Sequence, residues 1–139
     1  MVTNDYGYKG FQSSCDYDQR LLSPVRPTGF VRLDSNADSF KKALSEGPIA
    51  AVVEADKLAF RFYNSGILNS DKCGFDADHA VSIVGWGIAE GGDTLEYYIV
   101  KNSWSSLWGE DGYVRIAIAV GPNGTGICGV HTAGYVPTF

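Results

Sequence analysis

The sequence lacks long apolar runs and an excess of positive charge. No stretch approaches the roughly eighteen consecutive apolar residues of a membrane-spanning helix, and the first residues lack the basic and apolar regions of a signal peptide. The 11 basic residues are outnumbered by 16 acidic ones, and a net charge of −5 has the wrong sign for a phosphate-binding surface. We therefore expect neither a nucleic acid nor a membrane as a partner.

Cysteine is also scarce, and its number is odd. Three cysteines in 139 residues are too few for a disulfide-dense scaffold, and at least one of them has no partner within the chain. Charged residues make up only 19% of the sequence and hydrophobic residues 45%, which excludes a disordered chain and favours a globular fold.

Glycine and aromatic residues, by contrast, are abundant. The chain has 17 glycines, together with 3 tryptophans, 8 tyrosines and 7 phenylalanines. This combination favours turns and strands over long helices. No internal repeat or low-complexity segment is present. We expect an α+β fold, predominantly antiparallel β.

Hydrophobic periodicity predicts one helix and several strands. The helix is capped by Ser35 or Asn36, buries a face that includes Phe40, and ends at Gly47-Pro48. Strands are expected at residues 28–33, 49–53, 80–86, 96–101, 113–118 and 132–136. Residues 90–93 are expected to form a hairpin turn, residues 57–70 a helical turn and loop, and residues 6–27 a surface loop.

His79 is the candidate general base, because it stands where a predicted strand begins. A nucleophilic hydrolase needs a base near its nucleophile and a third group that fixes the tautomer of the base. Asn102 ends the next strand, so a hairpin can bring its amide oxygen to one imidazole nitrogen and leave the other for a thiol. Trp104 could shield that bond from water. The alternatives are a structural histidine and a core tryptophan.

Several short motifs surround these residues in a fixed order. They are Asp78-His79-Ala80-Val81, Gly85-Trp86-Gly87, Lys101-Asn102-Ser103-Trp104, Trp108-Gly109 and Gly112-Tyr113-Val114. Together they resemble the second half of a papain-like cysteine peptidase of cathepsin L type. Weaker matches at Tyr6–Gly10, Thr28–Val31 and Cys128-Gly129 extend the resemblance nearly end to end. It implies a barrel-like second lobe at residues 31–139 and a mostly looped remnant of the first lobe at residues 1–30.

The resemblance implies a role for each matched residue. His79 would be the imidazolium partner of a catalytic thiolate and would protonate the leaving amine, while Asn102 would orient its ring. Trp104 would cover the bond between them. Asp78 would tune the titration of the catalytic pair, and Trp108 would wall the leaving-group side of the cleft.

Two alanines and two cysteines are matched as well. Ala77 and Ala133 would line a roomy apolar substrate pocket that accepts Leu or Phe side chains. Cys73 and Cys128 would form the disulfide of the second lobe, although a buried reduced pair is the alternative. The disulfide would imply a lysosomal or secreted protein. The triplet Asn123-Gly124-Thr125 is a candidate N-glycosylation site, which would be consistent with the secretory route; the alternative is that it is only a turn.

The chain departs from the family pattern at two points. Ser105 stands where members usually have glycine, at a cost of about 1 kcal/mol if the position needs a positive φ. The nucleophilic cysteine and the oxyanion-hole glutamine are expected upstream of this chain. Cys15 is a poor substitute, because no helix begins near it and Asp16 would raise its pKa; the resemblance implies a structural cysteine whose disulfide partner lies upstream.

The expected function is therefore thiolate–imidazolium hydrolysis of peptide bonds, with a chain that supplies histidine and asparagine but not cysteine and is inactive alone. The alternative is a catalytically dead papain-like binding module. The resemblance implies no cofactor. It implies as partners a peptide or protein substrate, the missing first lobe or a propeptide, and cystatin-like inhibitors.

Two other functions are weighed and discounted. The segment Gly85–Glu90 begins like a dinucleotide-binding fingerprint, but its third glycine and the following helix are missing. Asp76, Asp78, His79 and His131 could offer metal ligands, but their spacing matches no known metal motif. His131 has no matched role and is expected at the surface.

Overall fold

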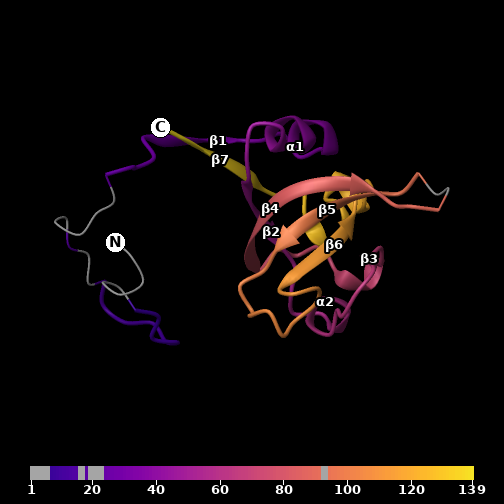
Figure 1. Cartoon of the computed structure of the whole chain (residues 1–139), viewed down its shortest axis with the longest axis horizontal. Helices are drawn as coiled ribbons and strands as arrows, with labels where there is room; N and C mark the ends of the chain where they lie inside the picture. Colours follow the sequence, from indigo (N-terminus) through magenta and orange to yellow (C-terminus); the bar gives the residue numbers. More distant parts are fainter. Residues whose placement is uncertain (1–6, 16–17, 19–23, 92–93) are drawn as a thin grey trace.

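The computed structural model describes residues 7–15, 18, 24–91 and 94–139. In these residues, strands form a seven-stranded sheet of order β1-β7-β2-β4-β5-β6-β3 (Figure 1). The strands are β1 (Gly29–Arg32), β2 (Ile49–Val53), β3 (Ile67–Leu68), β4 (His79–Ile88), β5 (Glu96–Lys101), β6 (Tyr113–Ala117) and β7 (Gly134–Thr138). All the neighbours pair antiparallel except β3 and β6. The fold is α+β and mostly antiparallel, as expected.

The helices are short. They are α1 (Ala37–Leu44), α2 (Leu58–Arg61) and the 3-10 turns η2 (Asp71–Cys73), η3 (Pro122–Gly124) and η4 (Ile127–Gly129). Asn36 caps α1, since its side chain accepts a 2.8 Å hydrogen bond from the backbone N–H of Ser39, and Phe40 is fully buried. None of the helices in the described residues is long and apolar enough to cross a membrane.

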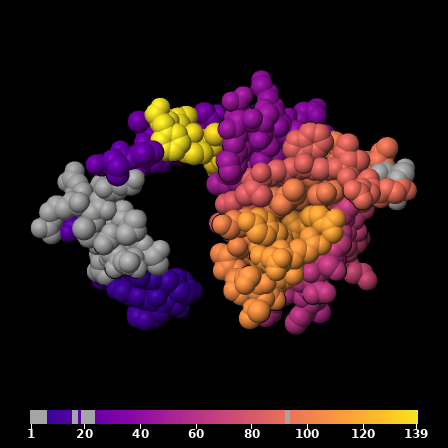
Figure 2. All heavy atoms as spheres, in the orientation of Figure 1, coloured from indigo at the N-terminus to yellow at the C-terminus, as the bar shows by residue number. Residues whose placement is uncertain are grey.

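The ends of the chain differ from expectation. The last strand covers Gly134–Thr138 and therefore includes Pro137, so the predicted strand at 132–136 was misplaced. Pro137 pairs with Phe30 of β1, but β7 contacts β2 only through Gly134 and Tyr135, so the other side of β7 has no strand partner at Pro137 and a proline is tolerated there. Residues 7–15 are exposed and stand apart from the folded body in Figures 1 and 2.

The hairpin between β4 and β5 is formed as expected. The backbone N–H of Ala89 donates to the Leu95 carbonyl at 2.9 Å, next to the end of β4. Residues 92 and 93 of the predicted turn lie outside the described residues, as does Asp16 beside Cys15.

The core lies against one face of the central strands. Along β4 the buried Val81 and Ile83 alternate with exposed neighbours, and on β5 Tyr98 and Val100 are fully buried. Phe40 of α1 packs against Tyr98, with ring centroids 6.1 Å apart. A buried disulfide joins Cys73 to Cys128 across 55 residues of sequence, which confirms the predicted pairing.

His131 belongs to this core, and its expected surface position was wrong. The side chain is only 3% exposed, its Nε2 lies 3.0 Å from the Tyr98 hydroxyl, and its ring packs edge-on against Phe40. Burial lowers the pKa of the imidazole, because the charged form loses its hydration. In the sequence His131 lies between the apolar Val130 and the polar Thr132, which did not settle its burial; the burial depends on packing against Tyr98 of β5, 33 residues away.

Candidate active site

His79 and Asn102 meet at one end of the sheet. His79 is the first residue of β4, and Asn102 directly follows β5, which pairs antiparallel with β4 from Ser82 and Lys101 onward. The Asn102 backbone N–H donates to the Gly112 carbonyl at 3.0 Å, so the residue directly before β6 also fixes its position. The His79 Nε2 lies 2.8 Å from the Asn102 Oδ1.

Neighbouring hydrogen bonds fix the tautomer of His79. The backbone N–H of Ser103 donates to the same Asn102 Oδ1 at 2.7 Å, which identifies that atom as the amide oxygen. An oxygen can only accept, so the His79 Nε2 carries the proton and Nδ1 keeps a lone pair. Nδ1 forms no hydrogen bond with a described residue, and the site thus presents a basic nitrogen.

Asn102 is held almost entirely out of solvent. Its side chain is 8% exposed, and its Nδ2 has no hydrogen-bond partner within the described part of the chain. A buried amide whose NH2 group has no acceptor costs stability, which the protein tolerates at this position.

Three aromatic rings gather beside the histidine. The ring centroid of Trp104 lies 5.2 Å from that of His79, and Phe60 lies 5.5 Å from Trp104 in an edge-on arrangement. Trp108 packs on Phe60 at 5.1 Å, and its Nε1 donates to the Arg61 carbonyl at 3.0 Å. Trp104 is 37% exposed, so it shields one side of the histidine ring while its outer edge faces solvent.

Ser105, which stands where family members usually have glycine, adopts a strained backbone conformation. Its φ is +75°, in the left-handed region where glycine is favoured. Its hydroxyl accepts a 3.3 Å hydrogen bond from the Leu107 N–H, which partly offsets the strain. The loop after Asn102 thus keeps a glycine-like geometry without a glycine.

A shallow cavity of about 310 Å³ opens against the histidine. It is lined by Ala55, Asp56, Arg61, Asp78, His79 and Trp104. The structure therefore brings three predicted site residues, Asp78, His79 and Trp104, to one cavity. The other three predicted substrate-site residues, Ala77, Trp108 and Ala133, are not part of its lining.

The two alanines flank β2. The backbone N–H of Asp78, next to Ala77, bonds to Val53 on one side of β2, and Gly134, next to Ala133, pairs with Ala51 on the other. Ala77 is exposed and Ala133 is half-buried.

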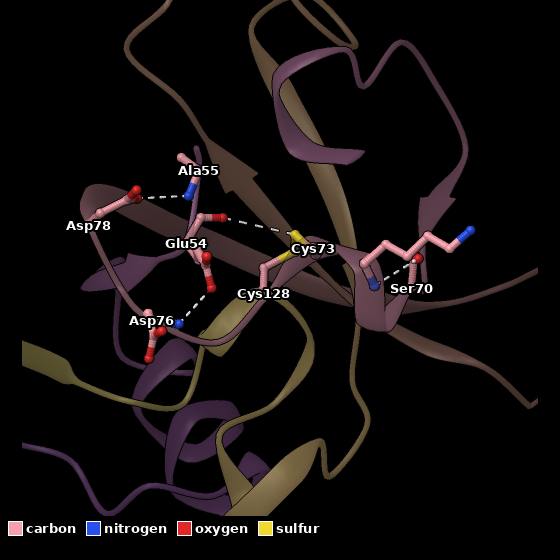
Figure 3. The surroundings of a disulfide bond; sticks show 8 residues. Glu54, Ala55, Ser70, Cys73, Asp76, Asp78 and Cys128 are labelled. Carbon is pink, nitrogen blue, oxygen red and sulfur yellow. Dashed lines mark hydrogen bonds between the residues drawn. A yellow bond between two sulfur atoms is a disulfide. The ribbon is translucent and has the colours of Figure 1, made fainter. Parts of the chain in front are cut away.

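Asp78 and Glu54 hold the backbone around the start of β4. The Asp78 Oδ1 accepts from the Ala55 N–H at 2.7 Å (Figure 3). Glu54, which sequence analysis missed, is 3% exposed, and its pKa is lowered first by Lys57 and then by the Asp76 N–H. The one available signal was an acidic residue directly after a buried apolar strand. Among the described residues, no three His, Cys, Asp or Glu side chains gather as a metal site would require.

Comparison with known proteins places this geometry in context. A family model described as papain family cysteine protease matches residues 1–138. Chymopapain from Carica papaya is 39% identical over 133 residues, covering 95% of this chain and 36% of the relative. Cathepsin L from Sarcophaga peregrina is 35% identical over 136 residues, covering 96% of this chain and 38% of the relative.

A solved structure of a similar protease has the same fold. The bromelain protease from Ananas comosus in complex with the E64 inhibitor superposes with a TM-score of 0.84 at 35% identity. The match covers 99% of this chain and 61% of that one. The chain thus spans little more than a third of the length of these two curated relatives.

Proposed function

The chain belongs to the papain family of cysteine proteases, and from this membership we propose that it supplies the histidine and asparagine of a cysteine peptidase active site. The observation that carries the proposal is the 2.8 Å contact between His79 Nε2 and Asn102 Oδ1, with the oxygen identified by Ser103. This contact leaves His79 Nδ1 as the free base of the site. Residues 31–139 are then the second lobe, and residues 1–30 belong to the first.

In this proposal His79 acts through Nδ1. The thiol proton moves to Nδ1, which creates a thiolate and an imidazolium, and the thiolate attacks the carbonyl carbon of the scissile peptide bond. When the carbon–nitrogen bond breaks, the proton on Nδ1 passes to the leaving amine. Water, deprotonated by the neutral Nδ1, then cleaves the thioester. Asn102 keeps the ring oriented through each step.

The nucleophile is proposed to come from a segment outside these 139 residues. Cys73 and Cys128 are consumed by their disulfide. Cys15 is exposed in residues 7–15, which stand apart from the folded body that carries His79 (Figure 2). We therefore expect the chain alone to be inactive.

Substrate and inhibitor binding follow from the same placement. We propose that peptide or protein substrates lie across the His79 cavity, that Ala77 and Ala133 line a pocket for Leu or Phe side chains, and that Trp108 walls the leaving-group side. The bromelain structure holds the inhibitor E64, which supports a shared inhibitor-binding surface. Cystatin-like inhibitors and the first lobe or a propeptide are proposed partners.

A lysosomal or secreted location is proposed from the Cys73–Cys128 disulfide, because such bonds persist in oxidising compartments. Asn123 is exposed, with a φ of +52°, in η3, so its side chain is available for N-linked glycosylation. Expression in a eukaryotic secretory host should add mass that a glycosidase removes and that Asn123→Gln abolishes.

Reconstitution tests the proposed function. We expect the chain alone not to hydrolyse a peptide amide with Leu or Phe at the second position before the cleavage site. A protein that also includes the cysteine-bearing part of a relative should show thiol-dependent activity. His79→Ala should abolish this activity. Asn102→Ala should lower kcat by about 10- to 100-fold but not abolish activity, because His79 can still act as the base although its ring is no longer held in place. Asn64→Ala, at an exposed asparagine, is the matched control.

Two outcomes would contradict the proposal. Turnover by the chain alone that disappears in His79→Ala would show that the nucleophile is within it. Specific peptide binding without turnover in the reconstituted protein would favour the catalytically dead binding module.

A further inference from the structure

Glu54 lies at the junction between β2 and the segment that leads into β4. It directly follows β2, and its side chain is 3% exposed. Its backbone N–H donates to the Cys128 carbonyl at 2.8 Å, so the disulfide-bearing turn η4 fixes the backbone of Glu54. Figure 3 shows its carboxylate pointing to the segment 74–78.

Both oxygens of this carboxylate are engaged. Oε2 accepts from the Asp76 backbone N–H at 2.6 Å, and Oε1 lies 2.7 Å from the Lys57 Nζ. The carboxylate also fills the space beside Gly74, whose φ is +80° and where an added Cβ would clash with Oε2. The segment therefore wraps closely around the side chain of Glu54.

The same segment delivers His79 to the site. The Asp78 N–H donates to the Val53 carbonyl at 3.0 Å, the Asp78 carboxylate accepts from Ala55, and Val53 is the strand partner of His79. Three consecutive residues at the end of β2 thus bind the segment, two through backbone groups and Glu54 through its side chain. We propose that Glu54 is a positioning residue that holds the segment 74–78 and, through it, the backbone of His79.

This inference rests on the proposed catalytic role of His79, but it also requires a specific chemical group at position 54. Two donors face the two oxygens of Glu54, so the site requires a group that only accepts. Lys57 and the Asp76 N–H lower the pKa of Glu54, so the carboxylate stays charged. A glutamine of the same shape has one oxygen, and its NH2 would face either Lys57 or the Asp76 N–H, donor against donor.

The test is NMR on the full chain, with histidine side chains labelled with ¹⁵N. In Glu54→Gln we expect the Asp76 amide to exchange with solvent at least about tenfold faster, because its acceptor is lost or weakened. The His79 Nε2–H resonance, which reports the bond to Asn102, should broaden or shift. Glu46→Gln is the matched control, because Glu46 is exposed and distant in sequence from the site.

A merely structural role gives a different result. It would lower the melting temperature of Glu54→Gln without moving the His79 resonance, and that outcome overturns the proposal. If Glu54→Gln does not fold, Lys57→Gln replaces it, since Lys57 is half-exposed and its loss leaves the Asp76 bond in place. The His79 Nε2–H resonance of Lys57→Gln should then shift or broaden relative to the wild type, and an unchanged resonance overturns the proposal.

The readout separates this inference from the proposed function. Neither the exchange rate nor the resonance depends on peptidase activity. A reconstituted protein that hydrolyses no peptide, with the expected NMR changes, would refute the peptidase and leave the positioning role intact. In an active reconstituted protein, Glu54→Gln should reduce kcat by more than it changes KM, because the substrate-contacting side chains remain; equal kcat in the variant and the wild type overturns the positioning role.

Discussion

Ser105 carries a local strain that a single substitution can relieve. A non-glycine residue at φ +75° costs about 1 kcal/mol, so Ser105→Gly should raise the free energy of unfolding by about 0.5 to 1 kcal/mol. The loss of the weak Leu107 hydrogen bond is the opposing effect, and it is exposed and long at 3.3 Å. Urea denaturation measures the change.

Ser106→Gly is the control for this prediction. Ser106 is exposed and has an ordinary negative φ, so glycine there should be neutral or destabilising. A loss of stability in Ser105→Gly would show that the hydroxyl matters more than the backbone strain.

The burial of His131 should make the free energy of unfolding depend on pH. Burial lowers its pKa in the folded state below the ordinary value of 6.5, so the unfolded chain takes up a proton more readily. The stability from neutral His131 is therefore full above about pH 6.5 and declines as the pH falls from there toward the folded-state pKa. Unfolding free energies measured between pH 7.5 and 5 should decline with acid.

Removal of the imidazole should flatten this pH dependence. His131→Gln keeps a polar group near the Tyr98 hydroxyl but cannot titrate, so its stability should be lower at pH 7.5 and fall less steeply. His79→Gln serves as the control for the other histidine of the chain. A wild-type slope retained in His131→Gln would assign the acid sensitivity to other groups.

At the scale of elements, the disulfide ties η2 to η4. It closes a loop of 55 residues, and in the chain-entropy model such a cross-link contributes roughly 4 kcal/mol. Replacing both Cys73 and Cys128 by serine should lower the free energy of unfolding by a large part of that amount. Cys15→Ser should leave it unchanged, because Cys15 is exposed and free. Equal stability of the double variant and the wild type would contradict the contribution.

Elements with a local signature could be predicted from sequence. The cap at Asn36 and the apolar run of β2 define their boundaries without reference to the rest of the chain. β3 could not be predicted, because its two residues form a strand only through their parallel pairing with β6. The limits of β7 depend in the same way on its pairing with β1, which carries it through Pro137.

In the candidate site, too, some residues could be predicted from sequence and others could not. The pairing of His79 with Asn102 was accessible because a hairpin joins their strands. Glu54 and Arg61 were not, because both reach the histidine through tertiary contacts: Glu54 accepts from the Asp76 N–H, and Arg61 lines the same cavity as His79. Motif order therefore identifies the hydrogen-bonded pair of the candidate site, whereas the residues that support and surround the pair depend on the folded chain.

At the scale of the whole molecule, exposed apolar side chains predict how the isolated chain behaves. Phe30, Val31, Phe62 and Leu107 are all more than half exposed, and Trp86 is 42% exposed. If the chain is one lobe of a two-lobe peptidase, part of this apolar surface is normally covered. We expect the isolated chain to bind a hydrophobic dye and to self-associate as its concentration rises, since such surface avoids water. Sedimentation velocity across a range of concentrations measures the association, and reconstitution with the first lobe of a relative should suppress it. A monomeric chain that melts cooperatively and binds no dye would instead identify an independent domain.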